Sequence, residues 1–152
     1  MAKSKEEKTN VMRTLEQKKI PYTAHSYDPE GPIDGVSVAQ TLGQPPEQVF
    51  KTLVTKGASG AYYVFDIPVA ENLDLKKAAK AVGEKSVAML PQKELLPLTG
   101  YVHGGCSPVG MKKPFPTWID ETALLTDAFF CSAGRLGAQI GPGASPLFLC
   151  RL

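Results

Sequence analysis

The sequence predicts an α+β fold, a single compact domain over residues 1–152 with a mixed, barrel-like sheet surrounded by helices. Short apolar strands recur at irregular spacing, and helical patterns concentrate in the first two-thirds of the chain. The regular strand–helix alternation of a parallel α/β fold is missing. No GxGxxG follows the first strand and no GxxxxGK[ST] is present, which argues against the common nucleotide-phosphate folds.

The N-terminal third predicts a helix, a strand and a second, short helix. Ser4-x-x-Glu7 has the pattern of a capping box, so we expect a helix from Ser4 to Lys19. The alternating segment PYTAHSYD predicts a strand. Ser37 is expected to open a short helix, VAQTL, which Gly43 closes.

The rest of the chain predicts a hairpin, a helix and several short elements. VFKTLVT (49–55) and AYYVFDIPV (61–69) are apolar strand patterns joined by the turn-like KGASG. Apolar residues over 75–82 recur at helical spacing, and Gly83 ends the pattern. The remaining patterns are a strand, KSVAML, a helical turn, PQKELL, and the segments TWID and DAFFCS around the glycine turns.

Composition narrows the class of protein. The net charge of +2 is too small to indicate general nucleic-acid binding, so any RNA contact is expected to be local. No window approaches the ~18 apolar residues of a membrane helix, and the charged start MAKSKEEKTN is no secretory signal, so we expect a cytoplasmic protein with no membrane partner. Three cysteines without CxxC spacing indicate reduced thiols.

Lys51 is the charge that stands out. On the strand VFKTLVT it shares a face with Val49 and Leu53, while Phe50 and Val54 occupy the other face. One interpretation is a lysine that extends its ammonium to water from an edge strand. The other is a cation at the rim of a pocket, aimed at a carbonyl, phosphate or ribose oxygen.

Two glycine-rich turns are candidates for ligand contact. GGCSPVG (104–110) and SAGRLG (132–137) can bring backbone close to a ligand and present N–H groups as donors to an anion, and Arg135 adds a forked donor. The alternative is that both are tight turns between strands.

Cysteine and histidine chemistry has weaker support. A dyad of Cys106 and His103 needs the imidazole within hydrogen-bond reach of the sulfur, and a spacing of three residues through two glycines is unspecific. A zinc site from His25, His103, Cys106 and Cys131 lacks a second paired half. Packing as small buried hydrophobes is the alternative for the cysteines, so no metal is expected.

Five lysines are candidates for contact with an RNA backbone. They lie on the predicted helix over 75–82 and after the first glycine loop: Lys76, Lys77, Lys80, Lys112 and Lys113. A solvated surface is the alternative. Tyr27 and His25 share one face of their strand, where either can stack on a base or cover the core.

Four stretches carry a resemblance to a known family. FKTLV, LDLKKAAKAVG, TGYVHGGCSPVGMKK and SAGRLGAQI occur in an order and at a spacing that resemble the YbaK-type Cys-tRNA(Pro) deacylases, relatives of the editing domain inserted in bacterial prolyl-tRNA synthetases. The resemblance runs from about Lys18 to Ile140. After Ile140 the family usually continues into an acidic segment, whereas this chain has no Asp or Glu after Asp127.

The resemblance implies an enzyme that hydrolyses the ester between a mischarged amino acid, chiefly cysteine, and the 3′-terminal adenosine of tRNA. It implies no cofactor, and it makes prolyl-tRNA synthetase a candidate partner. Lys51 and Gly105 are then expected to be catalytic. The expected substrate-binding residues are Tyr27, Thr52, Gly104, Cys106, Ser107, Ser132, Gly134 and Arg135.

The chemistry implied by the resemblance needs no protein nucleophile. The substrate thiol attacks its own ester carbonyl and forms a cyclic thiolactone, while Lys51 and the glycine-loop amides position the ester and stabilise the oxyanion. Alternatives are a catalytically silent module that binds tRNA or prolyl-tRNA synthetase, a deacylase for another small amino acid, and a thiol hydrolase that uses Cys106.

Overall fold

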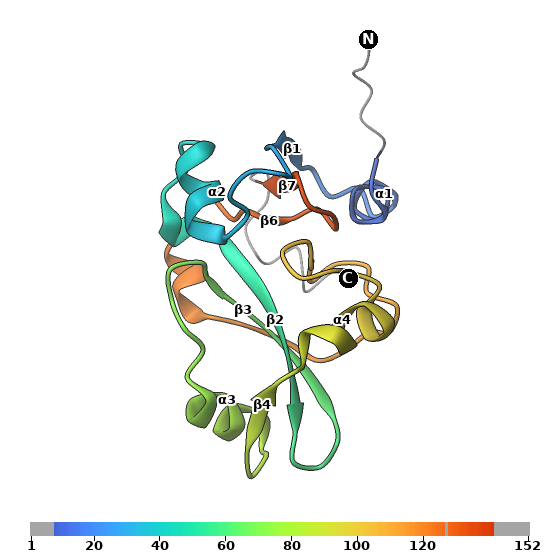
Figure 1. Ribbon diagram of the computed structural model, residues 1–152, viewed down its shortest axis with the longest axis vertical. Helices are drawn as coiled ribbons and strands as arrows, with labels where there is room; N and C mark the ends of the chain where they lie inside the picture. Colours follow the sequence, from blue (N-terminus) through green and yellow to red (C-terminus); the bar gives the residue numbers. More distant parts are fainter. Residues whose placement is uncertain (1–7, 127, 142–152) are drawn as a thin grey trace.

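The computed structural model describes residues 8–126 and 128–141, and its strands form two sheets (Figure 1). The first is antiparallel, in the order β1 (Thr23–Ser26), β7 (Ala138–Gly141), β6 (Cys131–Ser132). The second has the order β4 (Val87–Met89), β2 (Phe50–Gly57), β3 (Tyr62–Pro68), β5 (Thr117–Ile119). It is mixed, because β5 pairs with β3 in parallel while the other pairs are antiparallel.

Short helices connect these strands. They are α1 (Asn10–Gln17), α2 (Gly35–Thr41), α3 (Leu75–Val82) and α4 (Gln92–Thr99), with 3₁₀ turns η1 (Pro46–Gln48) and η2 (Glu121–Leu125). In Figure 1, α2 lies beside the first sheet, and α3 lies at the far end of the second sheet next to β4. Within the described ranges, none of the helices has the length and apolar character to cross a bilayer.

The predicted α+β class is confirmed, but the sheet is not closed into a barrel in the described residues. The two sheets meet at an isolated parallel bridge between Val49 and Phe130. There the Phe50 N–H donates to the Phe130 carbonyl over 2.8 Å, and the Phe130 N–H donates to the Gln48 carbonyl over 2.9 Å. Because β6 has only two residues, the contact is too short to continue the ladder.

The first helix begins later than the sequence predicts. Thr9 caps α1, since its hydroxyl accepts a hydrogen bond from the Met12 N–H. The predicted capping box, Ser4 to Glu7, lies outside the described residues. The helix therefore starts at Asn10, and its end at Gln17 is close to the predicted Lys19.

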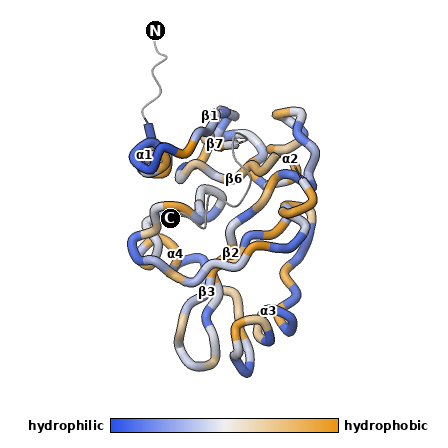
Figure 2. The backbone as a smooth tube through the Cα atoms, turned by 180° about the vertical axis from the view of Figure 1, so that it is seen from behind, coloured by the Kyte–Doolittle hydropathy of each residue, from blue (hydrophilic) through white to orange (hydrophobic). Residues whose placement is uncertain are grey.

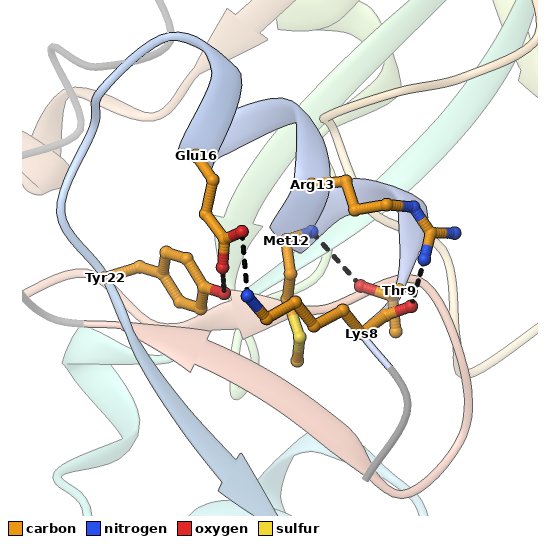
Figure 3. Close-up of polar contacts among 6 residues, drawn as sticks. All are labelled: Lys8, Thr9, Met12, Arg13, Glu16 and Tyr22. Atoms are coloured by element: carbon orange, nitrogen blue, oxygen red, sulfur yellow. Dashed lines mark hydrogen bonds and ion pairs between the residues drawn. The ribbon is translucent and has the colours of Figure 1, made fainter. Parts of the chain in front are cut away.

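Polar contacts tie α1 to the residues on either side of it. The Glu16 carboxylate accepts hydrogen bonds from the Lys8 ammonium over 2.9 Å and from the Tyr22 hydroxyl over 2.6 Å (Figure 3). On its other face, the helix buries Val11 and Leu15. The apolar face packs into the core and the charged face is exposed, and Figure 2 shows both hydrophilic and hydrophobic residues along α1.

Asp34, not the predicted Ser37, caps α2. The Asp34 carboxylate accepts from the Ser37 N–H over 3.1 Å, so the helix begins at Gly35, three residues before the expected start at Val38. In contrast, α3 has the predicted bounds. Asp74 caps its start, and Gly83 ends it with a φ of 77°.

The second sheet is packed on both faces. On one face Phe50, Val54 and Val64 join the core that α1 contributes to. On the other face Phe65 packs against Ala78 of α3, among other residues. This two-sided burial holds β2 and β3 rigidly, and the predicted hairpin between them is confirmed by their antiparallel register.

Candidate active site

A cavity of about 340 Å³ lies beside the first half of β2. Its wall comes from residues 49–53, from the start of α2, from the first glycine loop, and from β6 and β7. These segments are distant in sequence, and the bridge between Val49 and Phe130 brings them together. The volume is in the range of small-ligand sites.

The cavity follows a part of the β2 edge that no strand of the described residues covers. β4 pairs only with Thr55 to Gly57, and the Phe130 carbonyl takes the Phe50 N–H. Backbone groups of an antiparallel strand alternate between its two edges. Since Phe50 points its N–H away from β3, the N–H and C=O of Thr52 point the same way, toward the cavity side of the strand.

Lys51 lines this cavity and is half-buried. It pairs in register with Ile67 of β3, which fixes its backbone. Within residues 8–126 and 128–141, no carboxylate forms an ion pair with its ammonium. Of the two interpretations of Lys51, the cavity position favours the cation at a pocket rim, where it can meet an anionic or carbonyl oxygen.

The first glycine loop enters the wall through Gly104 and Cys106. Gly105 lies between them but faces away, and its N–H donates to the Val102 carbonyl over 2.9 Å. A Cβ on Gly105 would lie 3.0 Å from the amide nitrogen of Leu136. Gly105 therefore serves as the contact point at which the two glycine turns pack against each other.

The second turn contributes one predicted residue to the wall, Ser132. Its hydroxyl accepts a hydrogen bond from the Gly134 N–H over 3.1 Å, which closes the turn. Gly134 has a φ of 101°, which suits glycine, and its own position is against Val11. Arg135 is exposed and does not line the cavity.

The structure thus brings together part of the predicted set. Six predicted residues line the cavity: Tyr27, Lys51, Thr52, Gly104, Cys106 and Ser132. Four lie outside its wall: Gly105, Ser107, Gly134 and Arg135. Ser107 is fully buried, and its hydroxyl accepts from the Val109 N–H over 3.3 Å, so it stabilises the loop from behind.

The five lysines with a predicted tRNA role are all exposed and lie apart from the cavity wall. Three of them are on α3, at the end of the molecule opposite α2 (Figure 1). Lys112 packs its methylene chain against Gly100. Lys113 borders a separate pocket that Lys18 and Phe115 also line.

The segments that form the cavity match a known protein family. Residues 34–141, which include the cavity segments of α2, β2 and both glycine turns, match the family model described as an aminoacyl-tRNA editing domain. The chain belongs to the aminoacyl-tRNA editing domain family. The family expected from the sequence is therefore confirmed, and its activity is aminoacyl-tRNA deacylation.

A curated protein and several solved structures are similar to this editing domain. A protein of Enterococcus faecalis (strain ATCC 700802 / V583), named "Putative Cys-tRNA(Pro)/Cys-tRNA(Cys) deacylase EbsC", is 49% identical over 142 residues, 92% of this chain and 87% of the relative. A crystal structure of "a putative trans-editing enzyme for prolyl tRNA synthetase" superposes with a TM-score of 0.80 at 28% identity, over 91% and 86% of the two chains. A structure of the hypothetical protein APE2540, 22% identical, shares the fold with a TM-score of 0.83, over 93% and 91%.

The thiols of the editing domain are poor candidates for a nucleophile. Burial raises the pKa of the Cys106 thiol to about 12, and it raises the pKa of Cys131 well above its ordinary value. Both residues therefore stay protonated, as neutral packing groups. His25 contacts the Phe130 ring edge-on and belongs to the packing around β6, and no group of metal-ligating side chains is found in the described ranges.

Asp66 is a buried carboxyl that was not among the residues expected from the sequence. It lies on β3 opposite Thr52 and is fully buried, and its Oδ1 accepts from the Thr52 hydroxyl over 2.5 Å. Burial raises the pKa of Asp66 to about 7, and the Thr52 hydrogen bond opposes this rise. A lone aspartate inside the apolar run YYVFDIPV was the signal available in the sequence.

Other wall residues carried no sequence signal. Val36 and Val38 come from α2, and Gln139 comes from β7. Gln139 is almost fully buried, and it exchanges two amide hydrogen bonds of 2.8 and 2.9 Å with Gln44. This pair ties the segment after α2 to β7 across 95 residues of sequence, so it closes one side of the cavity.

Proposed function

We propose that this chain hydrolyses mischarged aminoacyl-tRNA, chiefly Cys-tRNA(Pro), and acts in trans as one domain over residues 1–152. The observation that carries the proposal is the cavity that joins Lys51 to the first glycine loop inside the region matched by the editing-domain family. The similar protein from Enterococcus faecalis, which is named as a Cys-tRNA(Pro)/Cys-tRNA(Cys) deacylase, supports the choice of substrate.

The cavity takes the aminoacyl end of the tRNA. Its volume of about 340 Å³ suits an amino acid with part of its terminal ribose, which leaves the remaining tRNA outside. Lys51 binds the ester carbonyl or a ribose oxygen as a cation. The exposed backbone of Gly104 and the neighbouring Cys106 N–H supply fixed donors for the oxyanion, and Gly105 holds their loop against the second turn.

The reacting sulfur belongs to the substrate. The thiol of the cysteinyl group attacks its own carbonyl carbon to form a cyclic thiolactone, the bond from that carbon to the ribose oxygen breaks, and the thiol proton ends on the ribose hydroxyl. Water then cleaves the new sulfur–carbon bond of the released thiolactone and restores cysteine. The proximity of the two groups in an intramolecular attack supplies much of the rate, so the protein needs only to orient the ester and stabilise charge. The neutral Cys106 thiol is consistent with this division of work.

Two further features belong to the proposal. The structural neighbour described as a trans-editing enzyme for prolyl tRNA synthetase favours that synthetase as a partner, since both then act on the same tRNA. A cytoplasmic site of action is expected because tRNA charging takes place there. No cofactor is part of the proposed reaction.

Release of radiolabelled cysteine from Cys-tRNA(Pro) tests the proposed function. The wild-type protein is expected to release cysteine, and Lys51→Met is expected to lower kcat/KM by ~10²–10³ while the melting temperature changes little, because Lys51 forms no ion pair in the described residues. Lys56→Met is the matched control, since Lys56 is exposed on the same strand and lies outside the cavity.

The same assay separates the alternatives. A panel of tRNAs charged with cysteine, alanine and serine identifies the amino acid. Retained activity in Lys51→Met rejects the assigned role of this lysine. Binding of tRNA or prolyl-tRNA synthetase without ester cleavage by the wild-type protein replaces the proposal with a silent binding module.

A further inference from the structure

We propose that Asp66 is a positioning residue whose buried carboxyl orients the Thr52 hydroxyl to accept a hydrogen bond from the side chain of the bound aminoacyl group. The inference rests on the proposed function and deepens it, because it names the pair that recognises a side-chain S–H or O–H donor. Thr52 contacts the ligand in this scheme, and Asp66 acts through Thr52.

The geometry places the pair at the cavity wall. Thr52 lines the cavity, and its hydroxyl is 2.5 Å from Oδ1 of Asp66. The two residues are direct register partners on β2 and β3, and the sheet is packed on both faces, so neither side chain can move far. Asp66 itself is fully buried and lies behind the wall.

The carboxyl has one oxygen committed and one without a partner. Oδ2 of Asp66 is buried with no hydrogen-bond partner in the described residues. A carboxyl in a packed sheet is costly when it is only half satisfied, so its presence needs an explanation beyond packing. The other oxygen of Asp66 binds the Thr52 hydroxyl, and Thr52 lines the cavity. We therefore relate the free-energy cost of burying this carboxyl to a function at the cavity.

The groups that face Asp66 are electrically neutral. Cys106 faces Asp66 from the glycine loop, and Cys131 faces it from β6. Burial, helped by a negative charge on Asp66, raises the pKa of both thiols, so both stay protonated. Tyr101, behind these thiols, keeps its proton as well, with a pKa raised to about 12. Directly after β5, the Asp120 N–H donates to the Asp66 carbonyl and not to its side chain.

The protonation state of Asp66 then determines whether the Thr52 hydroxyl accepts or donates a hydrogen bond at the cavity. An ionised carboxylate only accepts, so Thr52 donates its proton to Asp66 and offers its lone pairs to the cavity. A protonated carboxyl donates to Thr52, because a proton on Oδ2 would have no acceptor, and the Thr52 proton is then free to turn toward the cavity. Thr52 is thus an acceptor above the titration of Asp66 and a donor below it.

An acceptor at this position discriminates between amino acids. Lys51 and the loop amides are donors, and they suit the carbonyl that every aminoacyl ester carries. A side-chain thiol or hydroxyl is a donor that alanine lacks. A site built to pair with such a group rejects the analogue without it, because its own polar group is left unpaired.

The test uses three uncleavable probes: adenosine carrying cysteine, serine or alanine through a 3′ amide. Binding is measured by calorimetry between about pH 5.5 and about pH 8.5, on either side of the Asp66 titration. The informative number is the ratio of the alanyl to the seryl Kd. The titrating α-ammonium is common to both probes and cancels in this ratio, and the serine hydroxyl does not titrate in this range.

For the wild-type protein, the ratio is expected to be about tenfold at the upper pH and to fall to a few-fold at the lower pH. There the serine hydroxyl accepts a hydrogen bond from Thr52 and no longer donates to an oxygen that the ionised Asp66 polarises. Thr52→Val removes the preference at every pH, and Thr52→Ser retains it. Asp66→Asn makes the ratio independent of pH, since an amide does not titrate. Thr55→Val is the matched control, because the Thr55 hydroxyl is also buried on β2 but donates to the Tyr63 carbonyl.

Two results overturn the inference while the proposed function survives. One is an Asp66→Asn variant that keeps the pH dependence of the wild-type ratio. The other is a Thr52→Val variant that weakens all three probes equally, which would place the hydroxyl at the ammonium or the ribose. A wild-type protein that releases no amino acid from charged tRNA and binds none of the probes overturns both the proposed function and this inference.

Discussion

Gly105 packs so closely against Leu136 that a Cβ on Gly105 would lie 3.0 Å from the Leu136 amide nitrogen. The same Cβ would lie 3.0 Å from the Arg135 carbonyl carbon. Both neighbours are backbone atoms, so neither can rotate away. The contact joins the turn that carries Gly104 and Cys106 to the turn that carries Ser132, and these three residues line the cavity.

Gly105→Ala is therefore expected to separate the two glycine turns. Because the backbone has to shift by a few tenths of an ångström or more, we expect a loss of ~1–3 kcal/mol in the free energy of unfolding. Misplacement of the loop amides is expected to cost ~10²-fold in kcat/KM for deacylation. Urea denaturation and the cysteine-release assay measure the two effects.

Gly31→Ala is the control for that substitution. The nearest atoms to a Cβ on Gly31 lie 3.6 Å or more away, at ordinary contact distance. This variant should match the wild type in stability and activity. A Gly105→Ala protein with wild-type activity would show that the contact between the turns does not set the geometry of the site.

Asp66 predicts an unusual dependence of stability on pH. Its pKa is about 7 in the folded protein, whereas an aspartate in an unfolded chain titrates near ~3.9. Between these values the folded state binds a proton that the unfolded state has lost, so the free energy of unfolding falls as pH rises and levels off above about pH 7. The loss attributable to this one group is on the order of 4 kcal/mol.

Asp66→Asn isolates that contribution, because the amide keeps the size of the side chain and can still pair with Thr52. The difference in unfolding free energy between the variant and the wild type is expected to move in favour of the variant as pH rises from about 4 to about 8. Urea melts at several pH values measure it. Parallel pH profiles for the two proteins would mean that Asp66 does not titrate in this range.

The sequence predicts local elements of this fold better than their assembly. The β2–β3 hairpin and α3 follow from apolar periodicity with Gly83 as a stop, and each is confirmed. The predicted start of α2 is wrong by three residues because Asp34, not Ser37, is the cap. The barrel-like sheet that the sequence predicts is not closed in the described residues. The two sheets meet at the bridge between Val49 and Phe130, next to the two-residue strand β6, whose shortness no sequence pattern reveals.

The sequence predicts residues of the candidate site only where a single segment contains an unusual residue, such as a charge on an apolar strand. Lys51 is a charge on an apolar strand, and it lines the cavity as a pocket cation would. Asp66 is likewise a charged residue on an apolar strand, the next one along the chain. Its link to the site becomes apparent only from the cross-strand pairing with Thr52, which the sequence does not show. Gln139 meets Gln44 across 95 residues, a contact that periodicity and spacing cannot encode.

We expect that the Cys106 thiol does not act as a nucleophile in covalent catalysis. Its thiol is buried and its pKa is raised to about 12, so almost no thiolate exists near neutral pH. Cys106→Ala is expected to keep kcat/KM within about threefold, with a stability loss of about 1 kcal/mol from the reduced packing. Cys131→Ala, at a thiol that is also buried, should behave in the same way.

Iodoacetamide provides the second measurement for the thiols. The native protein is expected to retain its activity during incubation at neutral pH, since the reagent reacts with thiolates. Rapid inactivation that wild-type protein shows and Cys106→Ala does not, together with a large loss of turnover in that variant, would establish Cys106 as a nucleophile and reject the substrate-assisted reaction.

We expect the lysines of α3 to contribute to tRNA binding and not to the reaction in the cavity. Lys76, Lys77 and Lys80 are exposed and lie apart from the cavity wall, so they can contact the phosphate backbone of a tRNA but not its aminoacyl group. The triple change of these residues to Gln is expected to lower kcat/KM for Cys-tRNA(Pro) and to leave binding of the small cysteinyl-adenosine amide unchanged. For each phosphate that the variant no longer neutralises, the slope of log(kcat/KM) against log salt concentration should become shallower by about 0.9.

Lys56→Gln, on β2, is the control for a single exposed charge elsewhere. A triple variant that keeps the wild-type salt slope would show that the tRNA contacts another surface, such as the one around Lys112 and Lys113.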